Sequence, residues 1–293
     1  MFTGSLVALI TPFKNGAVDE KGFEKFVAWQ IKEGTDGLVP CGTTGESPTL
    51  SMEEHKRVID ICIAAAKGSG VPVIAGTGSN STAEAIELTQ HAKKAGADAA
   101  MLVVPYYNKP TQEGLYQHFR TIAEAVDIPQ ILYNVPGRTG VDLLPETVAE
   151  LAKTSNIVGI KEATGSMKRL TELQQLCPAD FMLLSGDDAS AAEFMLKGGH
   201  GVISVTTNIA PKQMAQLCHA ALSGDVEQTE AIDKTLQALH RDLFIEANPI
   251  PAKWALHRMA LITSDEVRLP LTQLEPIHGS IIEQALTQAG IEF

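Results

Sequence analysis

Lys161 is the side chain whose place in the sequence most clearly indicates chemistry. It ends an apolar run that starts at Ile157, and Glu162 follows it directly. Such a run is typical of a strand buried on both faces. Burying an ammonium group there is costly unless the group is paired or loses its proton. Two interpretations fit this segment alone: a lysine that reaches solvent at its strand end, or an amine that attacks a ketone.

Strand parity predicts the surroundings of this lysine. Side chains alternate between the two faces of a strand, so Ile157, Gly159 and Lys161 share one face. We therefore expect Gly159 to leave space below the lysine if Lys161 points inward. Val158 and Ile160 are expected on the other face, packed against helices.

A tyrosine ends the preceding apolar run of the chain. Ile131 and Tyr133 share one face of that run. If the two strands are neighbours, a phenol can lie beside the amine of Lys161. An inward tyrosine is commonly a core residue, but beside a lysine it becomes a candidate proton donor and acceptor.

Two glycine-rich loops follow earlier apolar runs. Residues 42–47 read G-T-T-G-E-S, and residues 76–80 read G-T-G-S-N. The first lacks the G-K-[ST] ending of a P-loop, and the second lacks the third glycine of a dinucleotide fingerprint. Loops of this kind can present backbone amides and hydroxyls to a carboxylate. Turn geometry alone also explains the glycines of each loop.

The elements that must position these residues alternate along the chain. Eight short apolar runs are separated mostly by helical patterns, which predicts a closed (β/α)8 TIM barrel; an open doubly wound sheet is the alternative. We assign residues 1–224 to this α/β barrel and 225–293 to a helical C-terminal extension. The expected strands lie at 6–9, 37–40, 71–75, 99–103, 130–133, 157–160, 181–184 and 201–204, and the expected helices at 20–33, 51–66, 82–95, 114–125, 145–153, 190–197 and 208–222. Capping boxes are expected at Ser51 with Glu54 and at Ser81 with Glu84.

Composition narrows the class of protein. The 293 residues carry a formal net charge of -12, which argues against a nucleic-acid surface. No apolar stretch approaches the length of about 18 residues that a membrane span needs. The N-terminus lacks a basic region before an apolar one, so no signal peptide is expected and the protein is expected in the cytoplasm.

Metal or cofactor chemistry has no support in the sequence. The eight histidines include no pair at i, i+4, and the four cysteines form no C-x-x-C pair. The cysteines are therefore expected to be reduced, packed thiols. We expect no metal site and no cofactor, which disfavours a metal-dependent or flavin barrel.

Several motifs together resemble the pyruvate-dependent class I aldolases, the family that includes N-acetylneuraminate lyase, over nearly the whole chain. They are G-T-T-G-E-S at 42–47, A-G-T-G at 75–78, P-Y-Y-N-K-P at 105–110, Q-E-G-L-Y-Q-H-F at 112–119, I-L-Y-N-V-P-G-R-T-G at 131–140, G-I-K-E-A-T-G at 159–165, L-S-G-D-D at 184–188 and N-P-I-P at 248–251.

The resemblance implies a role for each matching residue. Lys161 would form a Schiff base with pyruvate, and Tyr133 would donate and accept protons. Thr43 and Tyr107 would complete a proton relay, with Tyr107 supplied by a neighbouring subunit of a homotetramer built from dimers. The implied substrate-binding residues are Thr44, Gly186, Ile203 and Arg138.

Arg138 separates two branches of this family. In the synthase branch, which joins pyruvate to L-aspartate 4-semialdehyde in lysine biosynthesis, an arginine here holds the carboxylate of the second substrate. The lyase branch lacks it and usually has Ser-Thr where this chain has Thr43 and Thr44. The synthase activity is therefore expected. The alternatives are a lyase acting on a larger 2-keto acid and a catalytically silent barrel that senses a small molecule.

The resemblance also implies feedback inhibition by L-lysine at a dimer interface. Glu84 and Asn80 could hold an ammonium group, although the expected capping box explains Glu84 without a ligand. Met52 departs from the histidine of some lysine-sensitive members. The matching residues of this regulatory site are His55, Asn80, Glu84 and Tyr106, together with Pro48 and Met52.

Overall fold

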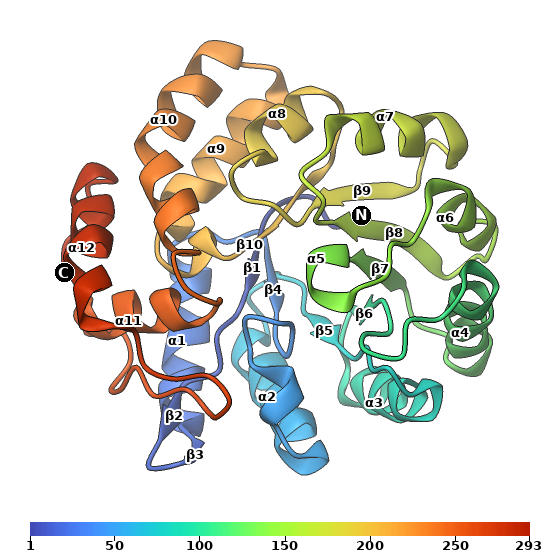
Figure 1. The fold of residues 1–293 in the computed structure, drawn as a ribbon, viewed down its shortest axis with the longest axis horizontal. Helices are drawn as coiled ribbons and strands as arrows, with labels where there is room; N and C mark the ends of the chain where they lie inside the picture. Colours follow the sequence, from blue (N-terminus) through green and yellow to red (C-terminus); the bar gives the residue numbers. More distant parts are fainter.

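Eight parallel strands form a barrel in the computed structural model, which describes residues 1–293 (Figure 1). The order around the sheet is β4-β1-β10-β9-β8-β7-β6-β5, and a bridge between Leu38 and Val73 connects its two ends. The predicted barrel is confirmed, and each expected strand overlaps an observed one. The strands are β1 (Gly4–Ala8), β4 (Gly37–Val39), β5 (Ile74–Gly76), β6 (Ala99–Val103), β7 (Gln130–Asn134), β8 (Ile157–Glu162), β9 (Met182–Ser185) and β10 (Gly201–Ser204).

Helices surround the barrel, and each expected helix overlaps an observed one. Four short elements were not predicted from the sequence: a hairpin of β2 (Phe13–Lys14) and β3 (Ala17–Val18), the single-turn helix α5 (Pro136–Thr139), and the 3-10 turns η1 (Ser47–Thr49) and η2 (Thr206–Asn208). The helix after β8, α7 (Met167–Leu176), was also missed, because it buries only Leu170 and Leu173. The other barrel helices are α1 (Glu20–Lys32), α2 (Met52–Ala66), α3 (Thr82–Ala95), α4 (Gln112–Ala125), α6 (Pro145–Leu151), α8 (Ala191–Leu196) and α9 (Pro211–Ser223).

The helical extension follows α9 and packs on the barrel helices. Asp225 caps α10 (Val226–Asp242), so the predicted boundary at 224/225 falls in the turn between α9 and α10. The chain continues through α11 (Ile250–Arg258), the 3-10 turn η3 (Pro276–His278) and α12 (Gly279–Gln288). None of the helices combines the length and apolar character needed to cross a membrane.

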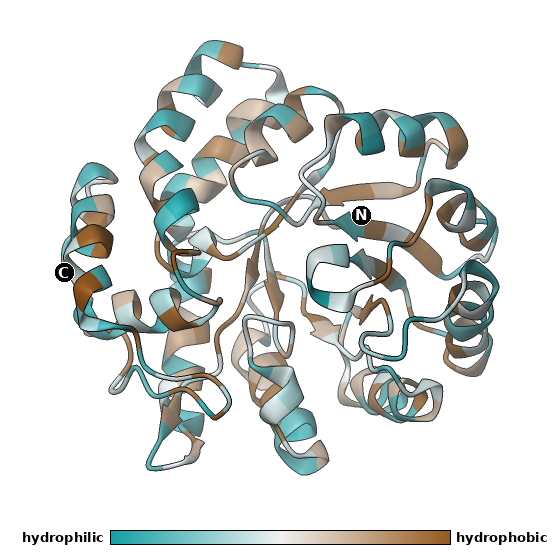
Figure 2. Cartoon of the chain, viewed as in Figure 1, coloured by the Kyte–Doolittle hydropathy of each residue, from teal (hydrophilic) through white to brown (hydrophobic).

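Hydrophobic side chains lie in two layers, inside the barrel and between barrel and helices. Figure 2 shows brown strands and teal outer faces on the helices. The interior layer is formed mainly by strand residues, among them Leu6, Val39, Met101 and Leu184. Since both faces of the strands are covered, the strands are near-continuous apolar runs.

One irregularity in β8 overturns part of the parity prediction. Gln130 of β7 is paired with Ile157, but the next residue, Ile131, is paired with Gly159, so Val158 is an extra residue in β8. A bulge of this kind shifts the side chains before it to the opposite face. Val158 therefore packs against the interior layer and Ile157 against the helices, the reverse of our prediction. Ile160 packs against the helices as predicted.

One of the two predicted capping boxes is complete. Ser51 and Glu54 exchange both hydrogen bonds at the start of α2. At the start of α3, Ser81 accepts a hydrogen bond from the backbone of Glu84, but the Glu84 carboxylate accepts one from the hydroxyl of Ser79 at 2.8 Å. The second box was therefore only half right, and capping does not account for the Glu84 carboxylate.

Candidate active site

A cavity of about 300 Å³ opens where the barrel strands end. The loop after β4 contributes Gly42, Thr43 and Glu46, the last residue of β5 is Gly76, and the loop after β5 contributes Gly78. Loops at the carboxyl ends of barrel strands are where this fold carries its chemistry. The remaining walls include Tyr106, Tyr133, Arg138, Asn248, Pro270 and Leu271.

Tyr133 lines this cavity, and Lys161 lies directly beside it. They are register partners on the neighbouring strands β8 and β7, and the lysine Nζ is 4.3 Å from the centroid of the tyrosine ring. Both side chains are buried. The predicted proximity of amine and phenol is confirmed, because the bulge in β8 precedes Gly159 and leaves the register of Lys161 intact.

Gly186, not Gly159, makes room for the lysine. A Cβ atom at position 186 would lie 2.9 Å from Lys161 Cε and 3.1 Å from its Cγ. A Cβ atom at Gly159 would lie 2.7 Å from Met182 Cβ. The expectation that Gly159 leaves space below Lys161 is therefore wrong: the neighbouring strand β9 brings Met182 against it.

The loop after β4 holds its two threonines differently. Thr43 lines the cavity. Thr44 is buried, and its hydroxyl accepts a hydrogen bond of 2.9 Å from the side-chain amide of Asn248. The sequence motif at 248–251 therefore contributes a residue to the site, a function that we did not predict.

A buried ion pair joins the same loop to the C-terminal extension. The Lys253 ammonium donates to the Glu46 carboxylate at 2.7 Å, and both side chains are at most 1% exposed. Burial lowers the pKa of Lys253, and the opposing effect of the nearby Glu46 carboxylate only partly offsets this. The backbone of Arg268 donates to the other Glu46 oxygen at 3.0 Å. This pair was missed, because nothing in the sequence connects residues 46 and 253.

Arg138 projects from α5 at the rim of the cavity. Its side chain is exposed, and it takes part in none of the ion pairs or side-chain hydrogen bonds of the chain. A guanidinium group has five N–H donors in a planar fork suited to a carboxylate. An arginine with no internal partner at a cavity wall can therefore bind an anionic ligand.

Tyr107 and Ile203, like Lys161, Thr44 and Gly186, are not among the residues that line this cavity. Tyr107 is 89% exposed and has a positive φ of 72°, whereas its neighbour Tyr106 lines the wall. Ile203 is a buried residue of the barrel interior. Within one chain, the structure brings together Lys161, Tyr133, Thr43, Arg138 and Gly186.

The predicted regulatory residues are held by contacts within the chain. The His55 ring is hydrogen bonded to the carbonyl of Gly76 at 2.7 Å, and burial lowers its pKa. Asn80 donates to the carbonyl of Tyr106 at 3.1 Å. Of the four residues only Tyr106 lines the main cavity. No group of three or more His, Cys, Asp or Glu side chains is arranged to hold a metal ion.

Comparisons with known proteins agree along the whole chain. The model of the dihydrodipicolinate synthetase family matches residues 1–289. A 4-hydroxy-tetrahydrodipicolinate synthase of Methylococcus capsulatus is 58% identical over 99% of this chain and 100% of its own.

Solved structures show the same likeness. A chloride-inhibited dihydrodipicolinate synthase of Acinetobacter baumannii, crystallised with pyruvate, is 54% identical, with a TM-score of 0.97 over 100% of both chains. A homologue from Cyanidioschyzon merolae, crystallised with lysine bound, is 40% identical, with a TM-score of 0.96 over 99% of both chains.

Proposed function

The chain belongs to the dihydrodipicolinate synthetase family, and from this we propose that its cavity joins pyruvate to L-aspartate 4-semialdehyde through a Schiff base on Lys161. The enzyme is an aldolase-type lyase of lysine and diaminopimelate biosynthesis, and its product is 4-hydroxy-tetrahydrodipicolinate. The unpaired guanidinium of Arg138, in the cavity that Tyr133 lines beside Lys161, is the observation that carries the proposal.

Covalent catalysis explains the chemistry without a cofactor. The unprotonated Lys161 amine attacks the ketone of pyruvate to give a carbinolamine, and loss of its hydroxyl as water, with a proton from Tyr133, gives an iminium ion. The iminium withdraws electrons from the pyruvate methyl group, which loses a proton to give an enamine. The enamine carbon attacks the aldehyde of the second substrate. The amine of that substrate then displaces Lys161, which closes the ring and frees the enzyme.

Tyr133 is the residue best placed to move protons in these steps. Its ring lies against Lys161 Nζ, and its hydroxyl can both donate and accept a proton. Transfers through placed groups of this kind are worth about 10²–10⁴ in rate. Thr43 lines the same cavity and is the second member of the proposed relay.

Thr44 and the ends of β9 and β10 are proposed to hold the pyruvate carboxylate. Because Asn248 donates to the Thr44 oxygen, the hydroxyl proton of Thr44 is free to donate to a carboxylate. The backbone N–H of Gly186 already donates to the carbonyl of Glu162 at 2.8 Å. We therefore infer that Gly186 contributes space rather than a donor, and that Ile203 contributes through its backbone.

Arg138 is proposed to bind the carboxylate of L-aspartate 4-semialdehyde. A guanidinium group binds a carboxylate through two parallel hydrogen bonds, which orients the aldehyde as well as holding it. The exposed position of Arg138 at the rim suits a substrate that arrives after pyruvate is attached.

We further propose a homotetramer of dimers that works in the cytoplasm. The exposed Tyr107 would enter the cavity of the partner subunit and complete the proton relay. L-lysine would bind beside His55, Asn80, Glu84 and Tyr106; the lysine-bound homologue supports this. The Glu84 carboxylate is its proposed ammonium ligand, because the capping box does not occupy it.

Reductive trapping tests the proposed function. The protein is incubated with pyruvate and borohydride, and digestion with mass spectrometry locates the adduct. We expect one adduct, on Lys161, and less of it when L-aspartate 4-semialdehyde is present to consume the enamine. A Lys161→Ala variant that still turns over both substrates, or an adduct at another lysine, would overturn the mechanism.

A further inference from the structure

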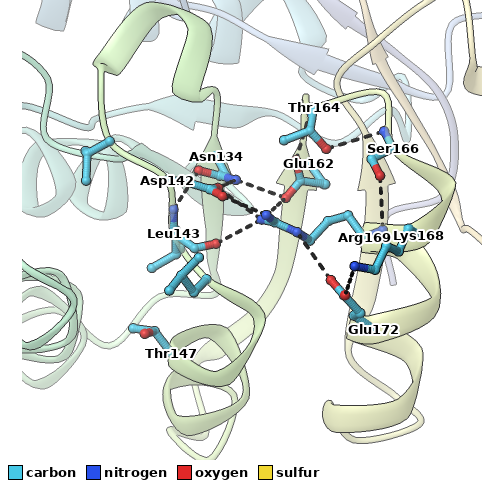
Figure 3. Close-up of polar contacts among 12 residues, drawn as sticks. Asn134, Asp142, Leu143, Thr147, Glu162, Thr164, Ser166, Lys168, Arg169 and Glu172 are labelled. Carbon is cyan, nitrogen blue, oxygen red and sulfur yellow. Dashed lines mark hydrogen bonds and ion pairs between the residues drawn. The ribbon is translucent and has the colours of Figure 1, made fainter.

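The loop that carries Arg138 is tied together at its base. It leaves β7 at Asn134 and returns at Asp142 and Leu143. The Asn134 side-chain amide donates to Asp142 at 2.7 Å, and its oxygen accepts from the backbone N–H of Leu143 at 3.0 Å (Figure 3). Asn134 is fully buried. One side chain therefore connects both ends of the Arg138 loop.

Arg169 of α7 closes the base of the loop from the outside. Its guanidinium donates to both Asp142 oxygens, at 3.0 and 2.6 Å, and to the Leu143 carbonyl at 3.2 Å (Figure 3). The Arg169 side chain is only 14% exposed. Two parallel charge-assisted bonds fix direction as well as distance. We call Asn134, Asp142 and Arg169 the loop clamp.

The charges of the clamp are complementary. Burial alone would raise the pKa of Asp142, but hydrogen bonds from Arg169 and Asn134 hold it below its usual value. The carboxylate therefore stays ionised at neutral pH, and the ion pair with Arg169 persists.

The clamp can affect the position of Arg138 only through the backbone of the loop. Arg138 lies in the middle of α5, a single turn that ends at Gly140 with a φ of 74°. The Thr139 hydroxyl bonds to the carbonyl of Val141 at 2.8 Å, which connects that turn to the clamped end of the loop. The Arg138 side chain itself has no contact that fixes it. Its direction therefore depends on how firmly the loop base is held.

We propose that the loop clamp positions Arg138 for the carboxylate of the second substrate and leaves Schiff-base formation with pyruvate unaffected. The inference rests on the proposed function. Lys161 is held independently, by its strand pairing and by the Tyr133 ring. Glu162, which follows Lys161, also has an ion pair of 3.6 Å with Arg169, but it keeps its hydrogen bonds from Asn134 and from the backbone of Thr164 when Arg169 is removed.

The first test replaces Arg169 and separates the two substrates. For Arg169→Met we expect the KM for L-aspartate 4-semialdehyde to rise about 10- to 100-fold, the cost of a misplaced binding group. The rate of borohydride trapping with pyruvate should stay within about twofold of the parent enzyme. Arg169→Lys keeps the positive charge but cannot form two parallel hydrogen bonds to Asp142. Its KM is therefore expected to lie between those of the parent enzyme and Arg169→Met.

Two further variants guard against trivial explanations. Arg57→Met removes a bidentate pair with Glu20 on the exposed helix surface, so it controls for loss of any arginine and should leave both readouts unchanged. Asp142→Asn keeps the size of the side chain and breaks the charge pair. It should also raise the KM for L-aspartate 4-semialdehyde. If Arg169→Met does not fold, Asp142→Asn replaces it in the test.

A double variant decides whether the clamp acts through Arg138. If it does, Arg138→Ala/Arg169→Met has the same aldehyde KM as Arg138→Ala alone, because Arg138 is then absent. The positioning role would be rejected if the double variant raised the aldehyde KM by the product of the two single effects. It would also be rejected if the rate of pyruvate trapping fell as much as aldehyde binding. If the parent enzyme forms a Schiff base and uses the aldehyde, either of these results rejects the positioning role of the clamp and leaves the proposed function standing. If the parent enzyme does neither, both proposals fail.

Discussion

At the scale of single residues, the place of Lys161 depends on the absence of one methyl group. Gly186, which directly follows β9, lies against the methylene groups of Lys161 on the neighbouring strand β8. Parity along one strand was enough to predict that Tyr133 and Lys161 are neighbours. It could not predict which glycine faces the lysine, because that depends on an adjacent strand and on a bulge that has no signal in the sequence.

Gly186→Ala should displace the amine of Lys161. The added methyl group would lie 2.7 Å from Ala163 Cβ and within 3.1 Å of two lysine carbons, and of these the flexible lysine side chain can move, so it must leave its place over Tyr133. We expect the rate of borohydride trapping with pyruvate to fall about 100-fold. Gly137→Ala is the matched control, because no atom lies within 4 Å of its added Cβ. Equal trapping rates for the two variants would contradict this account.

At the scale of elements, the C-terminal extension is part of the active site. Asn248 holds Thr44, and Lys253 of α11 holds Glu46. The extension was predicted as a helical layer, because amphipathic periodicity is a local property. Its contacts with the loop after β4 could not be predicted, because they join residues about 200 positions apart and leave no periodic pattern. The contact between α7 and the Arg138 loop could not be predicted either, because it also joins separate elements and leaves no periodic pattern.

Lys253→Met should destabilise the fold more than removal of both charges. The single change leaves the Glu46 carboxylate buried without its partner, which costs about 3–5 kcal/mol. Glu46→Gln/Lys253→Met removes the unpaired charge and should recover much of that loss. Urea unfolding measures both. Lys153→Met, which breaks an exposed pair with Glu150, is the control and should change stability by less than about 1 kcal/mol. A double variant less stable than the single one would refute the prediction.

At the scale of the whole molecule, the proposed proton relay needs a residue from a second chain. Tyr107 is exposed and lies outside its own cavity. If it enters the partner's cavity, Lys161→Ala and Tyr107→Ala chains should each be nearly inactive and should regain activity when unfolded and refolded together. In a mixed dimer one of the two cavities has both residues intact. Activity in the mixture that equals the sum of the separate variants would rule out a shared site.

The molecule should lose stability in acid partly through His118. Burial lowers its pKa to about 4 in the folded state, against about 6.5 when unfolded. The unfolded chain therefore binds the proton first, and stability falls as the pH drops through this interval. Between pH 7 and pH 5 this residue accounts for about 2 kcal/mol.

His118→Gln should flatten that pH dependence. Urea unfolding at pH 7 and pH 5 gives the loss of stability for each protein. The variant is expected to lose about 2 kcal/mol less than the parent over this range. An unchanged difference between the two pH values would show that the protonation of His118 is not coupled to unfolding.

The bond between Asn248 and Thr44 also has a consequence for synthesis on the ribosome. The two residues are separated by 204 positions in the chain. At about 5–20 residues per second, Thr44 is made roughly 10–40 seconds before its partner. Throughout that interval the Thr44 hydroxyl lacks the hydrogen bond from Asn248. Translation therefore orders the events of assembly: the barrel strands are all available first, and the cavity takes its final shape only when the last quarter of the chain has emerged.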